Sequence, residues 1–141
     1  MRFMMFMIPD GYQGARGQEQ DPAFDVPDEA VAKMIAYNEE LTKAGVVLSM
    51  DGLMHPTYGT RVTFDGGSPV VVDGPFAESK EVVGGYWVIQ TKTREEAIEW
   101  AKRVPVAEPG DVIELRQIFD YEDYPENLRD AIDASEAKAG S

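Results

Sequence analysis

The sequence contains no cysteine, and His55 is its one histidine. Without cysteine the chain has neither disulfide bonds nor thiolate metal sites, which suits a reducing compartment, so we expect a cytoplasmic protein. An iron site of two histidines and one carboxylate needs more histidines than one chain offers. These absences predict that the protein holds no metal and no cofactor.

Positive charge is also scarce. There are 13 lysines and arginines against 26 aspartates and glutamates, giving a formal net charge of -13. An acidic surface repels phosphate backbones and anionic lipid headgroups, so we expect neither nucleic acid nor a membrane surface as a partner. No apolar run approaches the length that spans a bilayer.

The residues that are present follow the periodicity of an α+β fold, within a chain of 141 residues that suits a single domain. Asp25 and Thr93 are candidate N-caps of two helices, which Gly45 and Pro105 end. The predicted strands are 2–8, 46–50, 60–64, 69–72, 86–90 and 112–119, and the predicted helices are 26–44 and the segment between Thr93 and Pro105. This β-α-β-β-α-β order, with a hairpin extending the middle connection, is the ferredoxin-like arrangement.

Both faces of the predicted sheet are apolar, because residues 2–8 and 86–89 place large apolar side chains on both alternating sets. Two helices cover one face of such a sheet, and the other also needs to leave water. A second copy stacked sheet on sheet would achieve this, and two-fold dimers are the commonest homo-oligomers. We therefore predict a homodimer.

Two segments lie outside this core. Residues 9–25 are rich in Gly, Gln, Asp and Pro, and a connection this long is typical of a functional lid or of a mobile loop. Residues 120–141 begin acidic and then place Leu128 and Ile132 at helical spacing. This tail fits either a short amphipathic helix, docked on the domain or on its partner, or a frayed end.

The segment Asp73–Ala101, DGPFAESKEVVGGYWVIQTKTREEAIEWA, resembles the signature region of the YCII-related, DGPF-motif protein family. The pieces GLMHPTYGTRVTF at 52–64, AKRVP and VIELRQIF extend the resemblance over residues 1–119, apart from the 9–25 loop. The resemblance implies the dimeric α/β barrel form of the ferredoxin-like fold. Shorter relatives are thought to use a histidine on the first helix with an aspartate just before the proline after the second helix. Here the first helix has no histidine and Arg103-Val104 precede Pro105, so that pair is absent.

His55 lies in the loop after the second strand and is the one side chain suited to proton transfer near neutral pH. Asp51, Asp73 or Glu78 are candidates to orient it. The alternative is that His55 is an incidental loop residue. The same choice applies to the polar residues on apolar strands, which either face solvent or line a cavity between two sheets: Arg61, Glu114 and Arg116.

The turn Asp73–Phe76 also has two interpretations. Its residue types are typical of a structural turn, but Pro75 lacks an N–H, so the usual aspartate bond two residues ahead cannot form. The Asp73 carboxylate must reach the Phe76 N–H or serve another purpose. The charged residues that follow, Glu78, Lys80 and Glu81, form either a solvated loop with weak ion pairs or a grip for an anionic group.

Two functions remain open on this basis. In the first, each copy binds a small organic molecule in a cavity walled by the sheet and closed by the 9–25 loop. Cofactor-free acid–base chemistry there would use His55 as proton shuttle and Asp73 as its orienting group. Arg61, Glu78, Lys80 and Glu81 would contact the substrate. In the second, the protein is a non-catalytic dimeric module that binds a metabolite or a protein partner.

Overall fold

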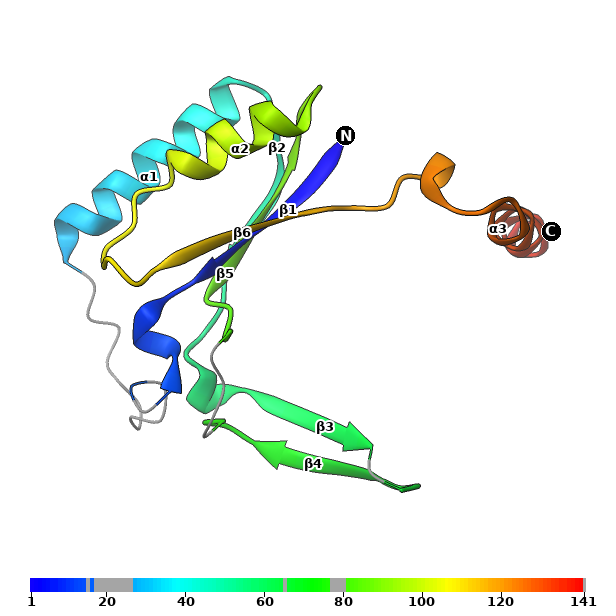
Figure 1. Cartoon of the computed structure of the whole chain (residues 1–141), viewed down its shortest axis with the longest axis horizontal. Coiled ribbons are helices and arrows are strands. Elements are labelled where there is room, and N and C mark those ends of the chain that lie inside the picture. The colour runs from blue at the N-terminus through cyan, green and yellow to red at the C-terminus, as the bar shows by residue number, and fades with distance from the viewer. Residues whose placement is uncertain (15, 17–26, 65, 77–80, 141) are drawn as a thin grey trace.

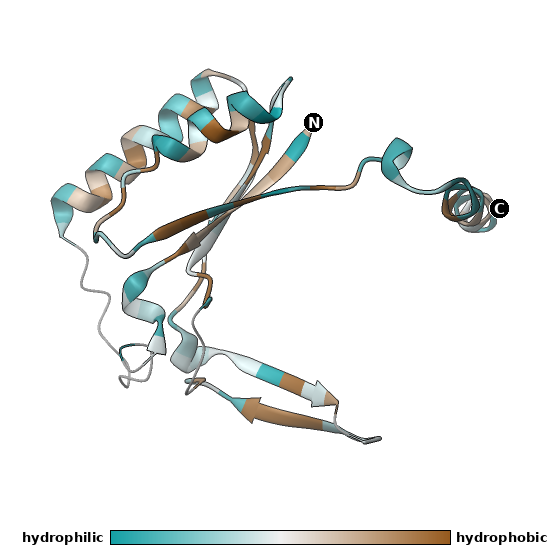
Figure 2. Ribbon diagram, in the orientation of Figure 1, coloured by the Kyte–Doolittle hydropathy of each residue, from teal (hydrophilic) through white to brown (hydrophobic). Residues whose placement is uncertain are grey.

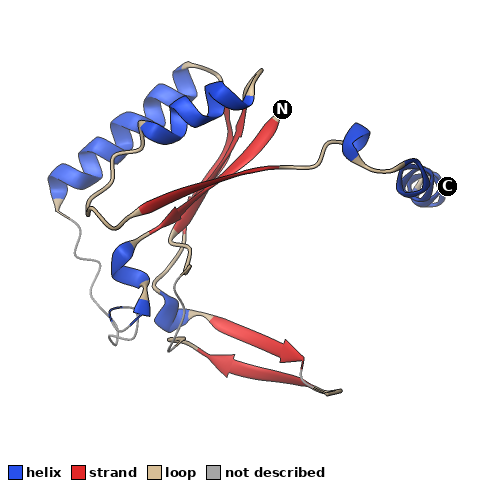
Figure 3. Cartoon of the chain, viewed as in Figure 1, coloured by secondary structure: helices blue, strands red, loops and turns tan. Residues whose placement is uncertain are grey.

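The structure, a computed structural model, describes residues 1–14, 16, 27–64, 66–76 and 81–140. Within them it has an α+β architecture (Figures 1 and 3), with a four-stranded antiparallel sheet in the order β2-β5-β1-β6 and a separate hairpin, β3-β4. This order is consistent with the predicted ferredoxin-like arrangement. The strands are β1 (Arg2–Ile8), β2 (Val47–Gly52), β3 (Thr60–Phe64), β4 (Pro69–Asp73), β5 (Gly85–Gln90) and β6 (Val112–Gln117), and the α-helices are α1 (Asp28–Lys43), α2 (Arg94–Lys102) and α3 (Glu126–Ala139).

β1 is the central strand, as its two apolar side-chain sets predict. It pairs with β5 on one side and with β6 on the other. Phe3 and Met5 point from it into the core, where both are almost fully buried with Leu41 of α1 and Ile89 of β5. The helices α1 and α2 cover this face of the sheet (Figure 1), so the hydrophobic core lies between them and the strands.

The helix ends follow the sequence signals closely but not completely. α1 ends just before Gly45, which adopts a φ of 70° as a residue after a helix often does. Its predicted N-cap, Asp25, lies outside the described residues. α2 ends at Lys102, so Val104 is buried but belongs to the following turn and not to the helix. The Thr93 hydroxyl caps the Glu96 N–H at 3.2 Å as predicted.

The second face of the sheet, which we call the open face, carries side chains from the alternate positions of each strand. The register places Met4 opposite Val88 and Arg116, and Phe6 opposite Tyr86 and Glu114. Figure 3 shows α1 and α2 on one side of the sheet, and the hairpin and α3 extending on the other. Hydrophobic and hydrophilic residues follow one another along β6 (Figure 2), and Glu114 and Arg116 interrupt the apolar side chains of the open face.

The hairpin was predicted correctly but forms a two-stranded sheet of its own. Val62 and Val71 are cross-strand partners on one side of it, next to Phe64, and their exposed fractions are 50%, 66% and 78%. A two-stranded hairpin has little stability alone, so its base must hold it in place. Among the described residues, no helix is long and apolar enough to cross a membrane.

Candidate functional site

The signature turn, Asp73–Phe76, packs against the loop that carries His55. The Gly74 N–H donates a hydrogen bond to the Gly59 carbonyl oxygen at 2.8 Å. A Cβ atom on Gly74 would lie 2.0 Å from the Pro56 carbonyl oxygen, so the two backbones meet where a side chain has no room. The sequence prediction that both loops lie near each other is consistent with this contact at the hairpin base.

Asp73 and His55 nevertheless have different partners. The Asp73 carboxylate accepts a hydrogen bond from the Thr60 hydroxyl at 3.1 Å, across the first pair of the hairpin. Its side chain thus links the ends of β3 and β4, which is a purpose beyond the bond to the Phe76 N–H and the contact with His55 that were considered from the sequence. Acid–base catalysis by this pair stays a prediction.

His55 caps the short helical turn Pro56–Tyr58. Its Nδ1 atom accepts the Thr57 N–H at 3.2 Å and lies 2.6 Å from the Thr57 hydroxyl. Because Nδ1 accepts a backbone N–H, the neutral ring carries its proton on Nε2 and offers a donor there. The Tyr12 ring meets the imidazole edge-on at a centroid distance of 4.9 Å, and burial raises the pKa of the Tyr12 phenol.

The predicted substrate-binding residues are dispersed. The Arg61 guanidinium lies over the Phe76 ring, 3.9 Å from its centroid, and so joins β3 to the signature turn by a cation–π contact. Glu81 is exposed. Glu78 and Lys80 lie outside the described residues, as does most of the predicted 9–25 lid.

The first residues of that predicted lid are fixed by polar contacts. The Gln13 side-chain amide donates to the Pro9 and Val82 carbonyl oxygens at 2.7 and 2.9 Å and accepts the Val82 N–H at 2.8 Å. The Arg16 guanidinium pairs with the carboxylates of Asp10 and Glu108 at 2.9 and 2.7 Å, and this pairing lowers the pKa of Glu108. These exposed pairs orient the segment more than they stabilise the fold.

A cleft of about 390 Å³ lies between α1 and the ends of β2 and β5. Its origin is visible in the register, where Gly85 of β5 faces both Met7 and Gly52. This row lies on the same face of the sheet as the Met50–Trp87 pair, because side chains alternate along a strand. Two of the three positions in this row, Gly52 and Gly85, carry no side chain. The space between this part of the sheet and α1 is therefore left unfilled.

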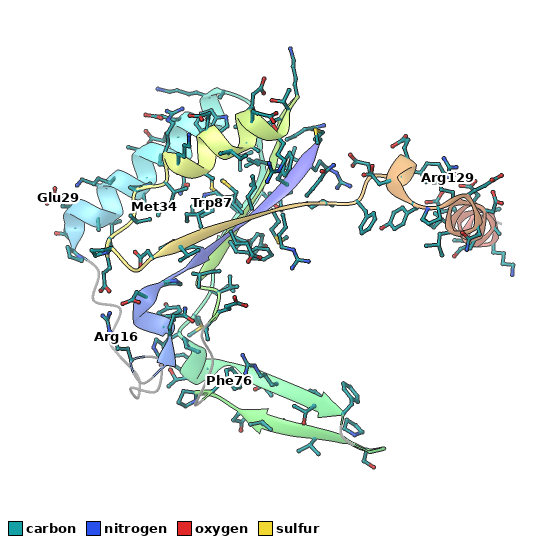
Figure 4. All side chains as sticks on the ribbon, viewed as in Figure 1. Arg16, Glu29, Met34, Phe76, Trp87 and Arg129 are labelled. Atoms are coloured by element: carbon teal, nitrogen blue, oxygen red, sulfur yellow. The ribbon has the colours of Figure 1, made fainter. Side chains whose placement is uncertain are left out.

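Thioethers and one indole form the walls of the cleft: Met7, Met34, Met50 and Trp87. Met34 projects from α1 toward the sheet that carries Trp87 (Figure 4). The Trp87 indole N–H donates to the Asn38 side-chain oxygen at 2.8 Å, which fixes the Asn38 amide with its NH₂ group as the remaining donor. The arrangement suits a flat apolar molecule with one hydrogen-bond acceptor.

Tyr86 and Asp51 form a polar pair on the opposite face of the same two strands. The Tyr86 hydroxyl donates to the Asp51 carboxylate at 3.0 Å, and this bond raises the pKa of the Tyr86 phenol. The two residues are cross-strand partners. Both residues are among those that line the cleft, although alternation along the strands places their side chains on the open face.

Sequence reasoning did not identify this cleft. Asn38 and Met34 sit in a helical pattern that indicates only core packing, and Gly52 and Gly85 look like ordinary strand ends. The signal was the coincidence of a glycine at the end of one apolar strand with a glycine pair at the start of another, Gly84-Gly85. Over the described ranges, no three His, Asp or Glu side chains gather as a metal site.

Comparison with known proteins identifies a domain family that matches most of the chain. The model of the YCII-related domain matches residues 1–122. An uncharacterized protein of Rhizobium meliloti (strain 1021) is 30% identical over 84 residues, which cover 59% of this chain and 68% of that protein. With the match extending over the whole sheet, both sheet-covering helices and the hairpin, the chain belongs to the family of proteins with a YCII-related domain.

Proposed function

We propose that this protein is a homodimeric binding protein for a small, uncharged, largely apolar organic molecule, which it holds in the cleft beneath α1. The observation that carries the proposal is the glycine row at Gly52 and Gly85, which leaves about 390 Å³ open beside three methionines and a tryptophan. Volumes of this size are typical of sites for small ligands.

The lining also favours a neutral ligand. Among the described residues, the lining includes no lysine or arginine, and alternation directs the side chain of its one acid, Asp51, to the open face, so no cation among them offsets the desolvation of an anion. The Asn38 NH₂ group is a neutral donor suited to a ketone, ester or amide oxygen. The charged candidates from the sequence, Arg61 and Glu81, do not line the cleft.

Acetophenone and benzoate test this proposal, because they are close in size and shape but differ in charge. We expect acetophenone to raise the melting temperature of the wild-type protein, and benzoate to leave it unchanged. Gly52→Val should fill the cleft, since a Cβ atom at Gly52 meets no atom within 4 Å, and should weaken acetophenone binding at least about tenfold.

Ala36→Leu is the matched control, because it adds apolar volume to the exposed side of α1 outside the cleft lining. It should leave acetophenone binding as in the wild type. Equal binding of acetophenone by the Gly52→Val variant, or no binding by the wild type at millimolar concentration, would contradict the proposal.

The dimer in this proposal follows from the open face. Met4, Phe6 and Val88 lie there with Glu114 and Arg116, which are two residues apart on β6. In a two-fold stack of sheets, Arg116 of each copy can face Glu114 of the other, so the surface is complementary to itself. Stacking would remove the apolar side chains from water without leaving the charges unpaired.

Sedimentation equilibrium checks the dimer. The wild-type chain should have twice its monomer mass at micromolar concentration, and Phe6→Glu should have the monomer mass because it buries a second carboxylate beside Glu114 in each copy. Ala36→Glu, on the exposed side of α1, should remain dimeric. A monomeric wild type at this concentration would exclude the dimer.

A further inference from the structure

The C-terminal helix α3 is held at a defined distance from the body of its own chain. Figure 1 shows it beyond the end of β6, separated from the sheet and from both of the helices that cover the core. Such a position is unusual for a helix with an apolar side, because 14 residues gain most of their stability from packing. A helix in this position needs contacts that fix its connection to β6 and a surface that covers its apolar side.

The connection is fixed by contacts with the start of β1. The Ile118 N–H donates to the Arg2 carbonyl oxygen at 2.9 Å. The Arg2 guanidinium donates to the Asp120 carboxylate and to the Phe119 carbonyl oxygen, both at 3.0 Å. Three bonds between distant parts of the chain thus set the direction in which residues 118–120 leave the sheet.

The helix is also tied to the turn that precedes it. The Tyr121 hydroxyl donates to the Asp133 carboxylate at 2.7 and 2.8 Å to its two oxygens, and the Asp120 N–H donates to Asp123 at 2.8 Å. The rings of Phe119 and Tyr124 stack at a centroid distance of 4.7 Å. The segment from Phe119 to the end of α3, residues 119–139, is therefore held in place by its own contacts and is not a frayed end. We call it the arm.

The arm presents apolar side chains that its own body does not bury. Leu128 and Ile132 lie one turn apart on α3, where Leu128 is 46% exposed and Ile132 is half-buried. Phe119, at the root of the arm, is 59% exposed. Exposed apolar groups on a rigid element are typical of a surface that packs against a partner.

The direction of the arm indicates which partner. α3 and the hairpin both extend on the side of the sheet opposite α1 and α2, so they flank the open face (Figures 1 and 3). A second copy seated on that face by its complementary Glu114 and Arg116 would lie between the two projecting elements. The two-fold axis would place each copy within the arm of the other.

We propose that α3 packs its Leu128 and Ile132 side against a second copy of this chain, so that each copy is clasped by the C-terminal arm of the other. The inference rests on the dimer proposed above. It names the residues beyond the sheet that hold the dimer together and gives the C-terminal segment a role outside its own domain. Removing the arm should weaken the dimer and leave the fold of the monomer intact.

The first experiment measures the dimer dissociation constant of three full-length chains by sedimentation. Leu128→Asp with Ile132→Asp should raise this constant at least about tenfold. Asn127→Asp with Ala134→Asp adds the same two charges to another side of the same helix and should stay within about twofold of the wild type. Equal constants for the apolar-side variant and the wild type would overturn the inference while leaving the dimer standing.

The second experiment follows hydrogen exchange of the α3 amides in the wild-type protein as its concentration is raised through the dissociation constant. Protection of residues 126–139 should increase with concentration if a second copy covers them. Concentration-independent protection would mean that α3 packs on its own chain, and would also overturn the inference. A wild type that is monomeric throughout would instead show that the underlying dimer is wrong.

Discussion

Replacing Gly74 with alanine is expected to lower the free energy of unfolding by about 3 kcal/mol, and to detach the hairpin from the domain. The added Cβ atom would lie 2.0 Å from the Pro56 carbonyl oxygen and 3.3 Å from that of Gly59. Both atoms belong to the backbone, so no change of side-chain rotamer relieves the contact. The two loops must separate, and the Gly74–Gly59 hydrogen bond is lost with them.

Urea unfolding followed by circular dichroism measures this effect, with Gly52→Ala as the control. A Cβ atom at Gly52 meets nothing within 4 Å, so the control should change stability by no more than about 0.5 kcal/mol. If Gly74→Ala were as stable as this control, the close packing of the signature turn against Pro56 would be wrong.

Replacing Trp87 with alanine should cost about 4 kcal/mol, the usual range for deleting a buried aromatic side chain. Trp87 is 6% exposed and meets the Tyr37 ring edge-on at 5.9 Å. It also forms a wall of the cleft and bonds to Asn38. One substitution therefore removes core packing, an aromatic contact and the group that orients the Asn38 amide.

A double-mutant cycle separates the hydrogen bond from the packing. Trp87→Phe keeps most of the ring volume but not the N–H, and Asn38→Ala removes the acceptor. The two changes together should cost about 1 kcal/mol less than the sum of the single changes, since each alone already breaks the bond. Additive effects in urea unfolding would show that the bond contributes nothing to stability.

Much of the fold was accessible from local sequence patterns. The doubly apolar run at 2–8 indicated a central strand, and the structure places β1 between β5 and β6. The hairpin and the second helix were indicated by turn residues and by the Thr93 cap. These predictions succeed because the side-chain periodicities of strands and helices repeat within a few residues, so that a short stretch of sequence reveals them.

The candidate site could be predicted from the sequence only in part, because tertiary contacts decide which residues meet there. Asp73 and His55 were singled out from the sequence, but the Gly74–Gly59 bond and the Tyr12–His55 contact join positions that no local pattern connects. Tertiary contacts of this kind depend on where the hairpin folds back. For Asp73, the sequence analysis therefore considered a bond to the nearby Phe76 N–H and did not predict the bond to Thr60.

The paired glycines at positions 52 and 85 determine how the size of the cleft beneath α1 can be altered. Space beneath α1 exists because these two residues lack side chains, not because neighbouring groups are bent away from one another. A single substitution at position 52, where an added Cβ atom meets nothing within 4 Å, would thus shrink the cleft while the scaffold stays as it is. If the cleft binds the proposed ligand, one residue would set the size of the molecule that fits, independently of the elements that hold the sheet together.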